Sequence, residues 1–201
     1  MGIPVLILGE SGSGKSTSMR NFDPSELTVF NVANKLLPFR KKLNVINNAG
    51  YGTIGKELQK QEKKIYVIDD SQYLLAFELF NRAKEKEYDK FTDIAVRFEK
   101  MLDYIIKGTP EDCIVYLLHH CETTDTGKIK AKTVGKMLDN QLTVEGLFSI
   151  VLYAFVEEDK HLFRTTNDGF CPAKAPMGMF EPIIDNDLKF VDTTIREYYK
   201  L

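Results

Sequence analysis

Nine consecutive residues near the start of the chain have the types and the spacing needed to bind phosphate. They fit the pattern G-x-x-x-x-G-K-[ST], with an apolar strand predicted before them at residues 3–8 and a helix after them at residues 15–20. The glycines let successive main-chain N–H groups approach and surround an anion. Lys15 would supply a positive charge for the β- and γ-phosphates, and the Ser16 hydroxyl is placed to bind Mg²⁺. The predicted loop consists of Gly9, Glu10, Ser11, Gly12, Ser13, Gly14, Lys15, Ser16 and Thr17.

A pair of carboxylates follows a second apolar strand further along the chain. Residues 65–68 predict a buried strand that ends in Asp69 and Asp70. Downstream of a phosphate-binding loop, this pattern is typical of a Walker B strand. Asp69 is predicted to hold Mg²⁺ through water, and Asp70 to orient or activate the attacking water. The alternative for Asp70 is structural, because it could cap the helix predicted at residues 71–88.

A third polar group follows the buried strand predicted at residues 113–118. This strand ends in His119, His120, Cys121 and Glu122. Because strand ends converge on the ligand in such sheets, either histidine could hydrogen-bond the γ-phosphate or its water and sense hydrolysis. One alternative is a metal site built from these four residues, although neighbours on one strand point to opposite faces. The other is a pair of ordinary loop histidines.

The order of these elements predicts a single α/β domain over residues 1–201. We expect a three-layer P-loop fold of the additional-strand kind, with a mostly parallel sheet and a C-terminal antiparallel hairpin. Further strands are predicted at residues 28–32, 43–46, 147–156 and 161–166, and further helices at residues 54–62, 91–107 and 192–201. Residues 123–136 predict a long basic loop without periodicity, of a kind that is often functional.

Composition and charge narrow the class of protein. The chain has 201 residues, of which 28% are charged, and its net charge is −2. A protein without an overall positive charge is not expected to attract nucleic acid over its whole surface, although a local basic patch could still bind it. Three cysteines without framework spacing suit a reducing compartment. We expect no secretory leader, and no apolar run approaches the roughly 20 residues that a membrane span needs. These features predict a cytoplasmic protein without membrane contact.

The sequence favours ATP over GTP as the nucleotide. Guanine recognition in small GTPases needs N-K-x-D, whereas Asn34 and Lys35 are followed by two leucines. Nucleoside kinases carry several arginines in a helical lid, whereas Arg82 and Arg97 fall within ordinary predicted helices. The predicted cofactors are therefore ATP and Mg²⁺, and the predicted reaction is ATP hydrolysis.

With these motifs in order, the chain resembles the RecA-like ATPases of bacteriophages, the AAA-type family that includes ATP-dependent single-strand annealing recombinases. The resemblance spans nearly the full length. It rests on the glycine-rich loop, on residues 65–70, on residues 119–122, and on weaker segments at residues 132–136, 163–166 and 173–176. It implies a RecA-like core, single-stranded DNA binding in phage recombination or replication, the cytoplasm of an infected bacterium, and a phage single-strand-binding protein as a partner.

The resemblance also implies a homo-oligomer in which a neighbouring subunit supplies a cation to the γ-phosphate. Lys174 is the first candidate for this cation and Arg164 the second, with a surface salt bridge as the alternative. RecA-like proteins commonly place a catalytic glutamate at the end of the strand after the P-loop helix, but residues 31–34 contain no carboxylate. Either Asp70 or Glu122 substitutes for it, or hydrolysis is slow.

Two other functions remain open from the sequence. A P-loop kinase for a small molecule or nucleotide would remove the γ-phosphate from ATP only in the presence of an acceptor. A nucleotide-dependent assembly ATPase without DNA specificity would show no stimulation by DNA and no salt-dependent DNA affinity.

Overall fold

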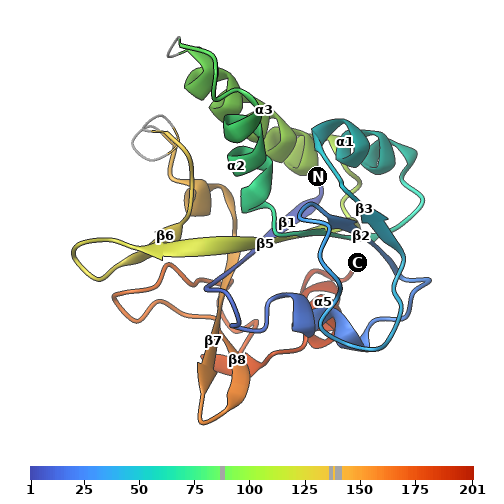
Figure 1. Ribbon diagram of the computed structural model, residues 1–201. Coiled ribbons are helices and arrows are strands. Elements are labelled where there is room, and N and C mark those ends of the chain that lie inside the picture. Colours follow the sequence, from blue (N-terminus) through green and yellow to red (C-terminus); the bar gives the residue numbers. More distant parts are fainter. Residues whose placement is uncertain (87–88, 136–137, 139–141) are drawn as a thin grey trace.

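The computed structural model describes residues 1–86, 89–135, 138 and 142–201, and Figure 1 shows their arrangement. In this part of the chain nine strands form one mixed sheet, in the order β3-β2-β4-β5-β1-β7-β8-β9, with β6 paired to β5 outside this row. The strands are β1 (Ile3–Gly9), β2 (Leu27–Asn31), β3 (Val45–Asn47), β4 (Ile65–Asp69), β5 (Ile114–Thr123), β6 (Ile129–Ala131), β7 (Ile150–Glu157), β8 (Lys160–Arg164) and β9 (Ile183–Asp185). The predicted α/β class and mostly parallel sheet are confirmed.

The strand that leads into the glycine-rich loop is not paired with the strand that ends in the two carboxylates. β5 lies between β1 and β4 and is parallel to both. The register pairs Gly9 of β1 with His120 of β5, and Asn31 of β2 with Asp69 of β4. The carboxyl ends of these parallel strands therefore meet along one edge, which is where such sheets bind ligands.

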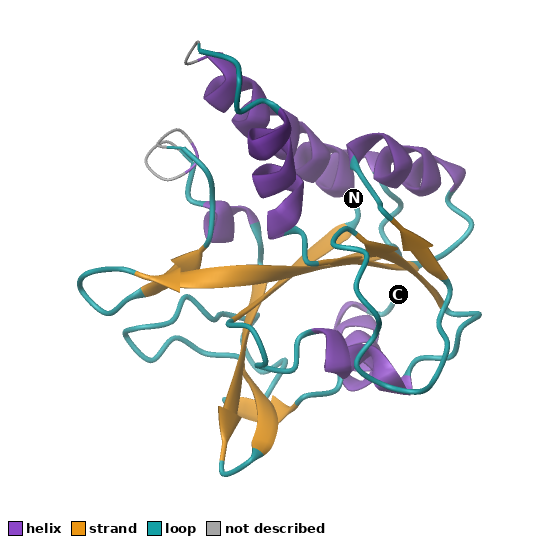
Figure 2. Ribbon diagram, viewed as in Figure 1, coloured by secondary structure: helices purple, strands orange, loops and turns teal. Residues whose placement is uncertain are grey.

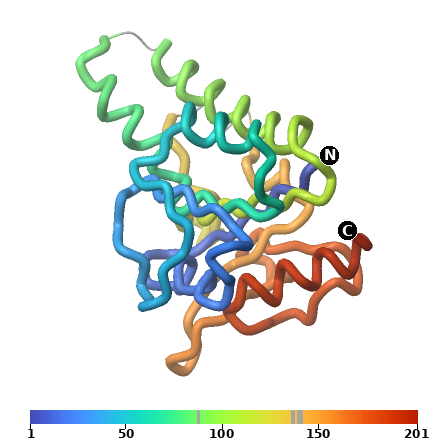
Figure 3. Tube along the Cα trace, turned by 90° about the vertical axis from the view of Figure 1, so that its right-hand side faces the viewer, coloured from blue at the N-terminus to red at the C-terminus, as the bar shows by residue number. Residues whose placement is uncertain are grey.

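Helices cover both faces of the sheet, as Figures 2 and 3 show. The helices are α1 (Tyr51–Lys60), α2 (Gln72–Asn81), α3 (Asp89–Gly108), α5 (Leu188–Tyr199) and the short 3₁₀ helices η1 (Ser16–Asn21) and η2 (Val144–Leu147). Alternate side chains of β1 point to opposite faces. Leu6 and Leu8 pack with α1, α2 and α3, whereas Val5 and Ile7 pack with η1 and α5. Each face of the sheet thus has its own apolar core.

The predicted C-terminal hairpin is confirmed. β7 and β8 pair antiparallel up to Glu157 and Lys160. The turn residues Glu158 and Asp159 both have positive φ, at 48° and 61°, which gives a two-residue turn the twist that its strands need. Since β7 is also parallel to β1, the hairpin lies next to the strand that carries the glycine-rich loop.

Two short strands are not predicted by the sequence. β6 pairs antiparallel with the end of β5, where Glu122 faces Lys130, inside the segment expected to be a loop. β9 pairs with β8. Each has only three residues, too few for an alternating pattern to stand out.

The helix after the glycine-rich loop differs from the expectation for residues 15–20. It is a 3₁₀ helix of six residues that ends at Asn21, and Phe22 is already extended. Asp23 precedes Pro24, and a residue before proline avoids the helical region. The proline therefore disfavours any continuation of the helix beyond Phe22, and the observed bounds are shifted by one residue from those expected.

Other helix boundaries also differ. α1 spans Tyr51–Lys60 rather than residues 54–62, and it buries Ile54 and Leu58 on the side that faces the sheet. α2 ends at Asn81 rather than at residue 88, which lies outside the described residues. α5 begins at Leu188 instead of residue 192. In the described part of the chain, no helix is both long and apolar enough to cross a membrane.

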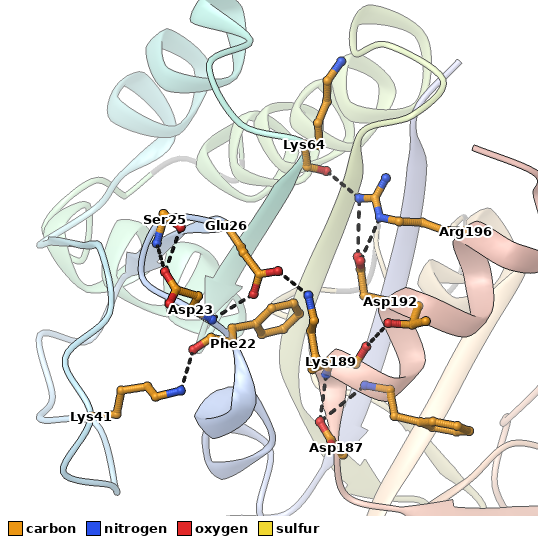
Figure 4. A network of polar contacts seen from close by, with 12 residues as sticks. Phe22, Asp23, Ser25, Glu26, Lys41, Lys64, Asp187, Lys189, Asp192 and Arg196 are labelled. Atoms are coloured by element: carbon orange, nitrogen blue, oxygen red, sulfur yellow. Dashed lines mark hydrogen bonds and ion pairs between the residues drawn. The ribbon is translucent and has the colours of Figure 1, made fainter.

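A network of polar contacts joins α5 to the segment that follows η1 (Figure 4). The Lys189 ammonium group contacts the Glu26 carboxylate. Arg196 donates to Asp192 Oδ2 at 2.8 Å and to the main-chain oxygen of Lys64 at 3.2 Å. These contacts attach the C-terminal helix to the residues that immediately precede β2 and β4.

Candidate nucleotide-binding site

The loop at the end of β1 has a main-chain shape that favours glycine at two positions. Gly12 and Gly14 have φ of +82° and +94°, a region that other residues rarely enter. At Gly9 the constraint is space, because a Cβ there would lie 2.8 Å from the carbonyl oxygen of Ala154. The N–H groups of Gly12, Gly14 and Lys15 have no acceptor among the described residues. The loop therefore offers a row of donors to an anion.

Lys15 is buried and bonded to its own loop. Its Nζ donates to the carbonyl oxygens of Gly9 and Glu10, both at 2.8 Å. Burial lowers the pKa of Lys15, and the nearby carboxylates of Asp70 and Asp69 oppose this effect. The ammonium group is thus held within the curve of the loop, where phosphate oxygens could replace the two carbonyls.

Ser16 and Asp69 meet although 53 residues separate them in the sequence, and Ser16 Oγ donates to Asp69 Oδ1 at 2.8 Å. Asp69 is only 6% exposed. Burial raises its pKa to about 6, and the adjacent Asp70 adds to this shift against the opposing charges of Lys35 and Lys15. A buried carboxylate of this kind would be stabilised by a divalent cation. The structure therefore brings together the two residues predicted to hold Mg²⁺.

Asp70 lies beside Asp69 but faces different partners. Its φ is +60°, and Oδ2 lies 2.5 Å from Lys35 Nζ while Oδ1 lies 3.1 Å from His120 Nε2. Burial alone would raise the pKa of Asp70, but the hydrogen bonds from His120 and Lys35 lower it overall. The capping alternative fails, because α2 has no side-chain cap and its N-cap residue is Ser71.

The two histidines at the end of β5 have different surroundings. His119 is fully buried, with Nδ1 2.9 Å from Ser71 Oγ and Nε2 2.9 Å from the Lys132 carbonyl oxygen. Burial lowers its pKa to about 4, so this ring is neutral and structural. His120 points the other way, toward Asp70, and packs edge-on against Tyr73.

The metal-site alternative at the end of β5 has no support. No group of three or more His, Cys, Asp or Glu side chains in the described part of the chain could hold a metal ion. Mg²⁺ beside a nucleotide needs only one or two protein ligands, so this does not bear on Ser16 and Asp69.

An open cavity of about 250 Å³ lies against the glycine-rich loop. Its lining residues are Ser11, Gly12, Gly14, Lys15, Ser16, Thr17, Lys35, Leu36, Pro38, Asp69, Asp70, His120 and His161. The sequence does not single out Lys35 or His161 as site residues. The cavity thus collects both predicted carboxylates, one predicted histidine and two further side chains.

Lys35 is placed by a side-chain clamp. Asn31, buried at the end of β2, donates to the Lys35 carbonyl oxygen at 2.7 Å and accepts from the Lys35 N–H at 3.2 Å. Asn34 between them has a left-handed conformation, with φ of +54°. In the sequence, the only indication of a fixed position for Lys35 is that Asn31 at a strand end is followed by Asn34 in a turn. Nothing in the sequence alone indicates that this turn lies beside Asp70. His161, on β8, packs its ring against Gly14.

Glu122 and Lys174 lie outside this cavity. Glu122 is ion-paired with Lys130 at 2.9 Å across the β5–β6 ladder. Lys174 is exposed, and its main chain exchanges two 2.8 Å hydrogen bonds with Val151. Arg164 Nε lies 3.4 Å from Asp168 Oδ2. A cation supplied by a neighbouring subunit therefore stays a prediction for both residues. Lys136, in the segment 132–136 that contributes to the resemblance, lies outside the described residues.

Comparison with models of protein families and with curated protein sequences finds no match to this chain.

Proposed function

We propose that this chain binds ATP with Mg²⁺ and hydrolyses the γ-phosphate bond. One observation carries the proposal, namely the 2.8 Å contact between Ser16 Oγ and Asp69 Oδ1 beside the free N–H groups of the glycine-rich loop. The two oxygens are of the kind that Mg²⁺ prefers, and a phosphate bound to the loop would lie next to them. ATP is the expected nucleotide because the sequence lacks the guanine-recognition pattern.

The residues that line the cavity have different roles in this proposal. Lys15 exchanges the carbonyl oxygens of its own loop for phosphate oxygens. Ser16 and Asp69 would hold Mg²⁺, which would supply positive charge to neutralise the charge that develops during transfer. Asp70 has a lowered pKa, so it is ionised at neutral pH and is a weak proton acceptor. Its role is to orient the attacking water, with its own position fixed by Lys35 and His120.

The biological setting that fits best is phage DNA recombination or replication, with a RecA-like core that binds or anneals single-stranded DNA as a homo-oligomer. Support comes from the ordered motifs of the sequence and from β5 lying between β1 and β4, as an additional-strand ATPase requires. Lys174 is exposed and therefore free to reach a neighbour's γ-phosphate, with Arg164 as second choice. A phage single-strand-binding protein is the expected partner.

A phosphotransferase is the second candidate, and a specific cavity favours it. A hollow of about 550 Å³ lies beside Tyr73, whose ring is 5.2 Å from Lys35 Nζ of the nucleotide site. An acceptor bound there would be close to the γ-phosphate.

The deciding experiment is ATP turnover by the purified chain with Mg²⁺, over a range of protein concentrations, with and without single-stranded DNA. The proposal expects turnover that DNA stimulates and that rises steeply with concentration. Loss of the γ-phosphate only with an added acceptor would favour the phosphotransferase. Absence of both nucleotide binding and turnover, with Lys15→Ala indistinguishable from the natural chain, would refute the nucleotide site itself.

A further inference from the structure

The cavity of about 550 Å³ beside the nucleotide site lies where β2 ends, between α1, α2 and α3. Its lining includes Tyr51, Tyr73, Phe77, Glu78 and Arg97. The volume is that of a site for a small organic molecule. Tyr73 connects it to the nucleotide site, because Lys35 lies over the Tyr73 ring and is also ion-paired with Asp70.

Two polar groups in this cavity are buried without the hydrogen bonds they need. The Tyr51 hydroxyl has no partner among the described residues, and neither does Glu78 Oε2. Glu78 Oε1 lies 3.0 Å from Arg97 Nη1, close enough for an ion pair but outside hydrogen-bond geometry. Buried polar groups are almost always paired in folded proteins, so these two atoms point to a ligand.

The two groups have complementary chemistry. Burial raises the pKa of Tyr51, and the charge of Glu78 raises it further, so the hydroxyl stays protonated and can donate. The Glu78 carboxylate can only accept. Arg97 also lines the cavity and lies 3.0 Å from Glu78 Oε1, with Arg82 at 3.8 Å from the same atom. The charge of Glu78 is therefore balanced, and a neutral polar ligand suits the cavity.

An aromatic face completes the cavity. Tyr73 and Phe77 stack with ring centroids 5.1 Å apart and planes 27° apart. Phe77 is nevertheless 43% exposed, so one side of this pair is open to a further planar ring. A base stacks favourably on such a side chain, whichever base it is.

We propose that this cavity binds a nucleobase that stacks on Phe77. A rotation of the Glu78 and Tyr51 side chains would bring their buried oxygens to the cavity surface, where the base would donate N–H groups to Glu78 and accept a hydrogen bond from Tyr51. The sugar and any phosphate then lie toward the open side, away from the buried carboxylate. The base comes from a free nucleoside or from single-stranded DNA, and both present the same ring. This second site goes beyond the proposed ATP site and does not depend on it.

The test is calorimetric binding to the full chain, without ATP, of the common nucleosides, a mixed-sequence single-stranded oligonucleotide and an abasic oligonucleotide of equal length. At least one base-bearing ligand should bind. Phe77→Ala should weaken that binding about tenfold or more, and Tyr51→Phe about fivefold. Phe80→Ala is the matched control, since Phe80 is 76% exposed on the same helix and does not line this cavity. It should bind as the natural chain does.

The ligand that binds identifies the source of the base. Nucleoside binding supports the proposal and adds weight to the phosphotransferase, whereas binding of the oligonucleotide alone supports it and adds weight to the DNA role. The proposal is overturned if no base-bearing ligand binds, if the abasic oligonucleotide binds equally well, or if folded Phe77→Ala and Tyr51→Phe proteins bind unchanged. Displacement of the bound base by a non-hydrolysable ATP analogue would also overturn the proposal, because the cavity would then be the adenine-binding part of the ATP site.

A Lys15→Ala chain separates this proposal from the ATPase proposal. It should lose ATP binding and keep base binding. If the natural chain fails to bind ATP but binds a base in a Phe77-dependent way, only the ATPase proposal falls. If it binds ATP but no base, only the second site falls.

Discussion

Replacing Asp69 by asparagine should stabilise the metal-free protein while removing its Mg²⁺ response. The Asp69 carboxyl is 6% exposed, and its pKa is raised from 3.8 to about 6, chiefly by burial. Because the folded pKa lies above the unfolded one, the stability that this group contributes is present below the unfolded pKa and is lost as pH rises through about 6. At neutral pH the ionised carboxylate therefore destabilises the fold.

The size of this effect follows from the shift. One pKa unit corresponds to about 1.4 kcal/mol, so ionisation of Asp69 costs the fold about 3 kcal/mol at pH 7.5. At pH 4.5 the folded carboxyl is protonated but the unfolded one is mostly ionised, and the cost falls to about 1 kcal/mol. The asparagine side chain of the variant would stay neutral at both pH values and could still accept the hydrogen bond from Ser16.

The assay is denaturant unfolding of both proteins with a metal chelator, at pH 7.5 and 4.5, followed by the same experiment at pH 7.5 with Mg²⁺ and ATP. We expect Asp69→Asn to raise the transition midpoint at pH 7.5 without changing the m-value, and to gain less at pH 4.5. Ligand should then stabilise the natural chain more than the variant. Asp70→Asn is the matched control with the opposite sign, because hydrogen bonds from His120 and Lys35 lower the Asp70 pKa. No gain for Asp69→Asn, or an equal gain at both pH values, would refute the electrostatic reasoning.

Four further outcomes are expected. Lys15→Ala should weaken ATP–Mg²⁺ binding about a hundredfold, as measured by calorimetry, because a buried cation bonded to phosphate oxygens is lost. Lys35→Ala should lower turnover about a hundredfold or more but change ATP affinity far less, since it acts on Asp70; equal losses in both would count against that role. The buried neutral His119 has a pKa of about 4, against 6.5 in the unfolded chain. The free energy of unfolding of the natural chain should therefore fall by about 2 kcal/mol between pH 7.5 and 5 because of this residue, and that of His119→Gln should fall by about 2 kcal/mol less. Lys174→Ala should lower turnover only at concentrations where the chain associates, and an equal effect at all concentrations would contradict a trans role.

The sequence was sufficient where the local pattern is itself the physical cause. The spacing of Gly9, Gly12 and Gly14 allows the loop shape, because a missing Cβ permits the positive φ of Gly12 and Gly14 and leaves room beside Gly9. The buried strands were found because β4 and β5 are continuous apolar runs. Boundaries were less certain, since η1 spans Ser16–Asn21 rather than residues 15–20, and α5 begins at Leu188 rather than at residue 192.

The sequence was not sufficient where a property depends on distant partners. It leaves Asp70 open as a cap or a site residue, and the decision rests on Lys35 and His120, which approach it from β2 and β5. It treats His119 and His120 alike, although alternation along β5 buries one and turns the other to the site.

The sequence by itself determined that this chain is an α/β protein with a phosphate-loop pattern and a pair of carboxylates at a strand end. Those features depend on residue type and short-range spacing. Only the tertiary structure decided that Ser16 touches Asp69 and that Lys35 joins the site. It also decided that a second cavity lies beside the site, where Tyr51 Oη and Glu78 Oε2 have no hydrogen-bond partner among the described residues. The reason is physical, because hydrogen bonds and pKa shifts depend on distances across the sheet edge that only strand order and register establish.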